Sequence, residues 1–143
     1  MKIVVASDHG GFAHKEAIKE YLVKQHHDVI DVGTNSLESC HYPLYAKKAA
    51  TSLVNHEVDR AVVVCTTGEG IMMTMNRFFG VRCGLAYEDE VTKLMRQHND
   101  ANAIAFGAKF MKIEDCLRRL DIFLNTPFEG GRHLTRVKMI DEH

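Results

Sequence analysis

Short apolar runs alternate with amphipathic stretches along the whole chain. The runs are rich in β-branched residues, which is typical of strands buried on both faces. They are Ile3 to Ala6, Val29 to Val32, Ala61 to Cys65, Arg82 to Ala86 and Ala103 to Phe106. Between them, apolar residues recur at helical spacing, most clearly over residues 13–22 and 113–124. This alternation predicts a three-layer, Rossmann-like α/β sandwich, with a five-stranded parallel sheet and helices on both faces.

Length and composition limit the classes of protein. The chain has 143 residues, of which 45% are hydrophobic, so we expect one domain spanning residues 1–143. A formal charge of -1 gives no field that would attract nucleic acid or an anionic membrane. The four cysteines show no C-x-x-C spacing, and the first residues resemble a strand rather than a signal peptide. We therefore expect a cytoplasmic protein with free thiols and no membrane segment.

Polar, glycine-rich segments follow three of the predicted strands. They are Ser7 to Gly11, Thr66 to Gly70 and Gly107 to Lys109. Ligands of parallel α/β sheets bind beyond the carboxyl ends of the strands, so these loops should converge on one ligand site. The irregular segment 33–42, which leads into Tyr42, should overhang the same edge.

Cys65 is the first candidate for chemistry. A strand that ends in a thiol, then a glycine-rich turn and a helix from Ile71, places a possible base beside several backbone N–H donors. A buried structural cysteine fits the same pattern equally well, because free cysteine is among the most buried residue types. We interpret Cys40, Cys83 and Cys116 as structural.

Two further candidates contain basic residues. His98 ends a helical stretch and is suited to proton transfer near neutral pH, although such residues are also common helix caps. Arg132 and Arg136 lie one turn apart on a predicted helix and suit a dianion clamp, although a solvated basic face is the simpler reading. Asp8 and His9 are ambiguous, because an aspartate before glycines often only forms a turn.

Motifs for metals and nucleotides are absent from the sequence. The nine histidines include no H-x-x-x-H or H-E-x-x-H pair, so we predict a metal-free site. The first strand is followed by Ser-Asp-His-Gly-Gly rather than G-x-G-x-x-G, and the 66–70 loop lacks the Lys-Ser/Thr of a P-loop. We expect no organic cofactor.

Taken together, the motifs resemble one family over nearly the whole chain. The segments SDHGGF, HYP, CTTGEGI, MNRF with GVRC, RQHNDANAIAFGAK and TPFEGGRHLTRV occur in the order seen in B-type ribose-5-phosphate isomerases and their galactose-6-phosphate isomerase relatives. The resemblance implies a cofactor-free aldose-ketose isomerase that interconverts ribose 5-phosphate and ribulose 5-phosphate through an enediolate. It also implies a homodimer or a dimer of dimers.

The same resemblance assigns roles to individual residues. It implies that Cys65 is the base, that Thr67 lies beside the reacting oxygens, and that His98 opens the sugar ring with Asp8 or a neighbour. Its implied substrate-binding residues are His9, Tyr42, Gly68, Gly70, Ile71, Asn99, Lys109, Arg132 and Arg136. Family members place this site at a dimer interface, to which the partner chain supplies the 98–99 segment and the residue at position 109.

The chain departs from the family pattern at three places. Thr66 replaces a loop glycine, Met72 and Met73 replace smaller or polar residues, and Lys109 replaces an arginine. Two alternatives therefore stay open: an isomerase of a six-carbon aldose 6-phosphate, such as allose or galactose 6-phosphate, and a non-catalytic module that binds a phosphorylated metabolite. The 130–133 segment favours the ribose type.

Overall fold

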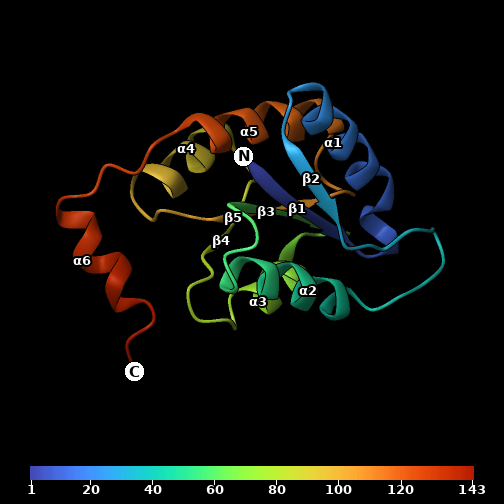
Figure 1. The fold of residues 1–143 in the computed structure, drawn as a ribbon. Coiled ribbons are helices and arrows are strands. Elements are labelled where there is room, and N and C mark those ends of the chain that lie inside the picture. The colour runs from blue at the N-terminus through green and yellow to red at the C-terminus, as the bar shows by residue number, and fades with distance from the viewer.

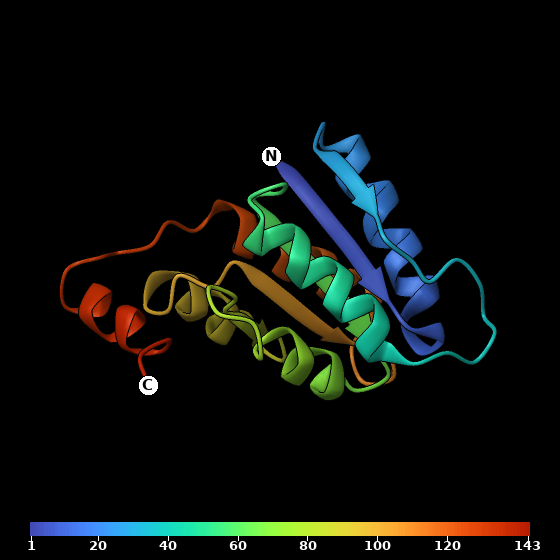
Figure 2. The same ribbon diagram turned by 60° about the horizontal axis from the view of Figure 1, so that its bottom comes forward.

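All five predicted strands form a single parallel sheet in the computed structural model, which describes residues 1–143 (Figures 1 and 2). The strands are β1 (Lys2–Ser7), β2 (Asp28–Asp31), β3 (Arg60–Cys65), β4 (Cys83–Leu85) and β5 (Ala103–Gly107). Their order across the sheet is β2-β1-β3-β5-β4. Each neighbouring pair is parallel. The predicted three-layer α/β class is confirmed.

Five helices cover the two faces of the sheet, and a sixth lies apart. The helices are α1 (Phe12–Lys24), α2 (Tyr42–Val54), α3 (Glu69–Met75), α4 (Asp89–Gln97), α5 (Ile113–Asn125) and α6 (Arg132–Met139). Helices α1, α4 and α5 lie on one face, and α2 and α3 lie on the other (Figure 1). The red helix α6 projects away from the sheet in both views (Figures 1 and 2). No helix is long and apolar enough to cross a membrane.

Alternation along the strands divides the core into two clusters. In β1, Val4 and Ala6 face α2 and α3, whereas Ile3 and Val5 face the opposite layer. Cys65 falls on the α2 and α3 side. The expectation that every strand is buried on both faces is wrong for β2, which is an edge strand with partly exposed side chains. The reason is that an edge strand has only one neighbour and lies where the helical layers end.

All strands of the parallel sheet begin on one side of it and end on the other. We call the side at the carboxyl ends of the strands the carboxyl edge and the opposite side the amino edge; neither name refers to the outermost strands. Between β3 and β5, Ala61 pairs with Ala103 at the amino edge, and Cys65 pairs with Gly107 at the carboxyl edge. Four residue steps in a strand span about 13 Å, so groups at the two edges of one chain are well separated.

A buried ion pair fixes α1 against the end of β2. The Lys15 side chain is fully buried, and its Nζ donates to Asp31 Oδ2 at 2.6 Å and to Glu16 Oε1 at 3.0 Å. Burial opposes ionisation of Asp31, but hydrogen bonds from Lys15, the Gly33 N–H and Lys19 outweigh it and lower the pKa of this carboxyl group. An ammonium group in this position depends on its carboxylate partners.

Replacing Asp31 with Ala should therefore lower the free energy of unfolding by about 2 kcal/mol, less than for a fully enclosed pair because Glu16 remains. Removing the exposed Glu20–Lys24 pair with Glu20→Ala is the control, and it should cost less than about 0.5 kcal/mol. The lowered pKa means that the Asp31 contribution is present above the unfolded-state pKa and is lost as the pH falls through the folded-state pKa. Urea unfolding at neutral and acidic pH measures both effects. Equal losses in the two variants would contradict the assignment.

Candidate functional site

Cys65 lies at the carboxyl edge, directly beneath the 66–70 loop. Its Sγ accepts a hydrogen bond from the Gly68 N–H at 3.2 Å. Gly68 has φ of +83°, which favours glycine, and it is the residue from which α3 begins. The strand, the left-handed turn and the helix therefore place an N–H donor on the sulfur, as the sequence pattern predicted.

The start of α3 presents further backbone donors near Cys65. The N–H groups of the first turn of a helix lack intrahelical acceptors. Glu69 donates its N–H to Thr67 Oγ1 at 3.2 Å, which holds the turn, and Glu69 itself is exposed. The N–H groups of Gly70 and Ile71 have no acceptor in the chain. They are the donors available to a negatively charged oxygen.

The loops after β1 and β5 pack against this turn, so the predicted convergence is confirmed. The Asp8 N–H donates to the Val64 carbonyl at 3.3 Å, and the Lys109 N–H donates to the Thr66 carbonyl at 3.1 Å. Lys109 therefore lies at the same edge as Cys65 within one chain, whereas the resemblance implied that a partner supplies this residue. Asp8 Oδ1 accepts from the Gly11 N–H at 3.1 Å and caps a short 3-10 helix. In this contact Asp8 forms a turn, which is one of the two roles that the sequence left open for it.

His9 and Tyr42 border the same loop from two other segments. His9 Nδ1 accepts the Cys40 N–H at 3.2 Å, so the 33–42 segment does pack on this edge. Because Nδ1 accepts, the ring carries its proton on Nε2, where it is able to donate to an anion. The Tyr42 ring lies against Gly70, where an added Cβ would come within 2.7 Å of Cε1. A side chain at position 70 would therefore displace the Tyr42 ring.

Cys65 is only 4% exposed, and none of the four principal cavities of the chain is lined by it. By contrast, Thr66, Thr67 and Glu69 in the loop above it are exposed. In one chain the thiol thus lies beneath an open loop rather than inside a walled pocket. Enclosing a ligand at this thiol would require residues other than those of these loops.

His98 and Asn99 lie at the amino edge, not beside Cys65. They follow α4 and precede Asn102, whose carbonyl accepts from the N–H of Ala61 at the start of β3. This is the end of β3 opposite to Cys65. The structure therefore does not bring His98 and Cys65 together within one chain.

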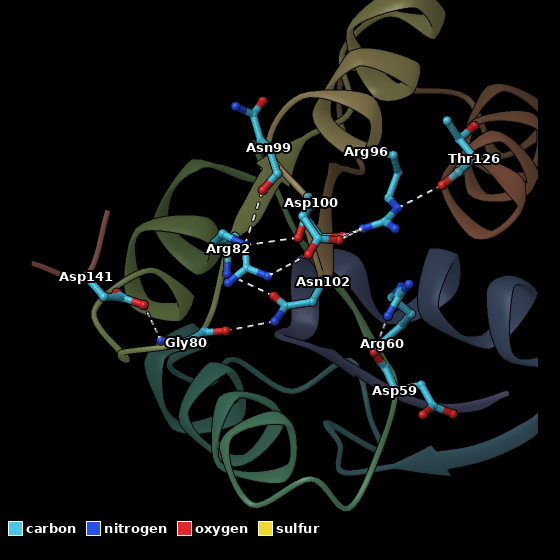
Figure 3. Close-up of polar contacts among 11 residues, drawn as sticks. Asp59, Arg60, Gly80, Arg82, Arg96, Asn99, Asp100, Asn102, Thr126 and Asp141 are labelled. Atoms are coloured by element: carbon cyan, nitrogen blue, oxygen red, sulfur yellow. Dashed lines mark hydrogen bonds and ion pairs between the residues drawn. The ribbon is translucent and has the colours of Figure 1, made fainter. Parts of the chain in front are cut away.

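A network of arginines holds the turn that carries His98 and Asn99 (Figure 3). Arg96 is buried, and it donates to Asp100 Oδ1 at 2.8 Å and to the Thr126 carbonyl at 3.0 Å. Arg82 Nε donates to the Asn99 carbonyl at 3.2 Å. Asp100 has φ of +48°, a conformation that aspartate tolerates better than most residues. Sequence reasoning treated Arg96 as part of a motif and missed this supporting role.

His98 also contacts two residues that the sequence analysis did not single out. Its ring stacks on His133, with centroids 4.3 Å apart and an interplanar angle of 12°. Glu129 Oε1 lies 3.5 Å from His98 Nε2 and 3.7 Å from His133 Nε2. Burial, the neighbouring His98 and Arg132 lower the pKa of His133. In the sequence, Glu129 and His133 stand out only as members of the EGGRH segment. Their contact with His98 forms only when the chain folds.

The arginines of the predicted clamp belong to the same amino-edge group. Arg132 and Arg136 lie one turn apart on α6 and are exposed, and α6 also carries His133. The predicted residues thus fall into two separate groups in one chain, which we call the carboxyl half-site and the amino half-site. The carboxyl half-site is Asp8, His9, Tyr42, Cys65, Thr67, Gly68, Gly70, Ile71 and Lys109, and the amino half-site is His98, Asn99, Arg132 and Arg136.

The departures from the family pattern have simple structural outcomes. Thr66 is not among the residues with positive φ, so that position does not require glycine. Met72 packs against the α2 and α3 core cluster, and Met73 is 61% exposed.

Burial raises the pKa of the Cys83 and Cys116 thiols, in Cys116 to about 11, which agrees with a structural role. Cys40 is half-buried beside His9.

The comparison with known proteins agrees with this geometry. Residues 3–140 match the Ribose/Galactose Isomerase family. Ribose-5-phosphate isomerase B of Escherichia coli is 40% identical over 139 residues, which cover 97% of this chain and 93% of that protein. A ribose 5-phosphate isomerase structure from Thermotoga maritima has a TM-score of 0.97 at 41% identity, covering 99% of this chain and 98% of that one.

A third relative was solved with a ligand. The ribose-5-phosphate isomerase B of Mycoplasma genitalium with bound ribulose-5-phosphate has a TM-score of 0.93 at 33% identity, covering 97% of this chain and 93% of that one. The fold and the loop site thus define an α/β enzyme of the isomerase class. The chain belongs to the Ribose/Galactose Isomerase family, as its motifs indicated.

The positive φ of Gly68 yields a test of the carboxyl half-site. An added Cβ would lie 2.6 Å from Leu85 Cδ1 and 3.0 Å from the Phe106 main chain. Gly68→Ala should therefore destabilise the fold by about 3 kcal/mol, from strain and close contact together. Gly80→Ala is the matched control, because Gly80 has φ of +85° with nothing within 4 Å, and it should cost about 1 kcal/mol. Urea denaturation compares the two, and equal effects would show that the space around Gly68 is not restrictive.

Proposed function

We propose that the protein interconverts ribose 5-phosphate and ribulose 5-phosphate through an enediolate, without a metal or organic cofactor. The observation that carries the proposal is the Cys65 sulfur beneath the start of α3, with a donor on the sulfur and two free N–H groups beside it. Family membership supports the reaction class, and the ribulose-5-phosphate bound to the Mycoplasma genitalium relative supports the substrate.

The proton transfers follow from the positions of these groups. In the open-chain aldose, the Cys65 thiolate takes the proton from C2, and the electron pair moves toward the C1 carbonyl oxygen. The resulting negative charge is stabilised by the N–H groups of Gly70 and Ile71, with Thr67 beside the reacting oxygens. Return of the proton to C1, with transfer of the O2 proton to O1, gives the ketose. A thiol alone is too weak a base for a carbon acid, so the base and the donors must act together.

The remaining roles concern the ring and the phosphate. We assign furanose ring opening to His98, which exchanges a proton between the C1 hydroxyl and the ring oxygen. Arg132, Arg136 and the Nε2–H of His9 suit the phosphate, with Lys109 as a point charge. Remote binding of the phosphate orients C1 and C2 toward the sulfur. Asp8, Tyr42 and Asn99 complete the proposed contacts.

We further propose that each site is shared between two chains of a homodimer. Within one chain, His98 and Cys65 lie at opposite edges of the sheet, and Cys65 lacks a walled pocket. A twofold arrangement that brings one carboxyl half-site to the partner's amino half-site completes two sites at once. Exposed apolar side chains occur near both edges: Phe110, 71% exposed, follows β5, and Met139 and Ile140 lie at the end of α6. Packing them against a second chain would remove apolar surface from water.

A cytoplasmic location is part of the proposal. All four cysteines are free, and Cys65 must remain reduced to act as the base. Such thiols persist in a reducing compartment.

Replacing Cys65 with Ala should lower kcat/KM for ribose 5-phosphate by at least about a thousandfold, because the base is removed. Exchange of the C2 proton with solvent, followed by NMR, should stop, while binding of the sugar phosphate should persist. Cys83→Ala is the control, since that thiol is buried away from the loop and should leave the rate almost unchanged. Normal turnover in the Cys65 variant would exclude the proposed base.

Mixing two inactive variants tests the shared site. Cys65→Ala and His98→Gln homodimers should regain activity when they are unfolded, mixed and refolded. A mixed dimer holds one site with both residues intact, so equal amounts should recover about a quarter of the wild-type rate for statistical pairing. Activity that stays at the level of the separate variants would contradict a site that combines Cys65 of one chain with His98 of the other.

The length of the substrate is the third test. The distance between the phosphate-binding groups and Cys65 should suit five carbons, because an added carbon moves C1 and C2 away from the sulfur. We expect kcat/KM for ribose 5-phosphate to exceed that for allose 6-phosphate and galactose 6-phosphate by at least about tenfold. Steady-state assays with the three substrates measure this ratio. A preference for a six-carbon substrate would reassign the substrate, and binding without turnover of any of them would favour a non-catalytic module.

A further inference from the structure

We infer that His98, Glu129 and His133 form a binding site for a zinc-like divalent cation, and that the cation inhibits the enzyme by occupying His98. The inhibitory part of the inference rests on the proposed function, in which His98 opens the sugar ring. The binding part rests on the geometry of the three side chains alone. It modifies the expectation of a metal-free site, because that expectation considered only ligand spacing along the sequence.

The three side chains converge although they come from separate segments. His98 ends α4, Glu129 lies in the segment before α6, and His133 lies in the first turn of α6. Their ligand atoms all lie within 4.8 Å of one another, and both Nε2 atoms face the same oxygen of Glu129. Two imidazoles and one carboxylate are a ligand set that zinc enzymes use.

The distances to Glu129 already suit coordination, but the two rings must rotate out of their stack. A tetrahedral zinc ion bonds its ligands at about 2.0–2.1 Å, which separates the ligand atoms by about 3.3 Å. The two contacts to Glu129 Oε1, at 3.5 and 3.7 Å, are already close to that value. The stacked rings must tilt toward one another, and Glu129 is free to follow because its side chain is 48% exposed and precedes two glycines. His98, at 38% exposed, leaves the fourth position open to water.

The charges near the cluster set the strength of binding. Glu129 supplies the only carboxylate of the cluster, whereas Arg132 and Arg136 on α6 repel a dication. We therefore expect reversible binding, on the order of micromolar, rather than a permanent structural metal. A borderline cation such as zinc, which accepts nitrogen ligands, suits the site better than magnesium or calcium, which prefer oxygen.

Coordination at Nε2 removes the lone pair with which His98 would exchange protons with the sugar. Ring opening at the partner's Cys65 should then slow, whereas the carboxyl half-site stays intact. The inhibition should be reversed by a chelator, because no covalent bond forms. Since Cys65 is itself a potential zinc ligand, the test must separate the two sites.

Titration calorimetry with ZnCl₂ on the Cys65→Ser protein provides that separation. We expect one zinc per chain, with affinity lowered at least about tenfold when Glu129→Gln or His133→Asn is added. Adding Glu142→Gln instead should change nothing, because this exposed glutamate of the same terminal segment lies outside the cluster. The absorption spectrum of bound cobalt, compared between the same variants, reports the coordination directly. Loss of zinc binding in Cys65→Ser, or equal affinity in all variants, would overturn the inference.

Inhibition is measured in the chain that retains Cys65. Measured against its own metal-free rate, Glu129→Gln should require at least about tenfold more zinc for half inhibition, because the only carboxylate ligand of the cluster is removed. EDTA should restore the wild-type rate. Zinc inhibition that is unchanged in Glu129→Gln would reject the regulatory role. If the protein shows the expected calorimetry but no isomerisation, the proposed function fails and the metal site stands; activity with no zinc binding gives the reverse result.

Discussion

The direction of the strands in a parallel sheet is the constraint on which the rest of this structure depends. Because all five strands run the same way, every loop that follows a strand lies at one edge, and every loop that precedes one lies at the other. Cys65 ends β3 and His98 comes shortly before β5, so their separation is set by the topology and not by any local side chain. In the proposed homodimer, this separation leads to two sites, each shared between the two chains.

Each half-site is held by contacts that fix its geometry before a ligand arrives. At the carboxyl edge, the left-handed Gly68 aims its N–H at the Cys65 sulfur, and the Tyr42 ring closes over Gly70. At the amino edge, buried Arg96 secures the turn after α4 through Asp100. Groups that are oriented by the fold do not need to reorganise during a reaction, which is why such backbone donors stabilise developing charge efficiently.

The amino half-site combines two chemistries in a small space. The imidazole proposed to open the sugar ring is also a good ligand for transition metals, and Glu129 brings a carboxylate to both His98 and His133. The cation site inferred above follows from the placement of His98 and His133 beside the Glu129 carboxylate. The arginines of α6 that are proposed to bind the phosphate are the same charges that would limit the affinity for a dication.

The sequence by itself determined the strands, the helices, the α/β class and the identity of the Cys65 loop, because these follow from local periodicity and from residues adjacent along the chain. Glycine at 68 and 70 and the run of β-branched residues before Cys65 are signals of this kind. Only the tertiary structure decided that Arg96 ties the end of α4 to Thr126, and that His98 meets Glu129 and His133. Contacts between residues about 30 positions apart depend on how helices and strands pack, and local sequence patterns carry no record of that packing.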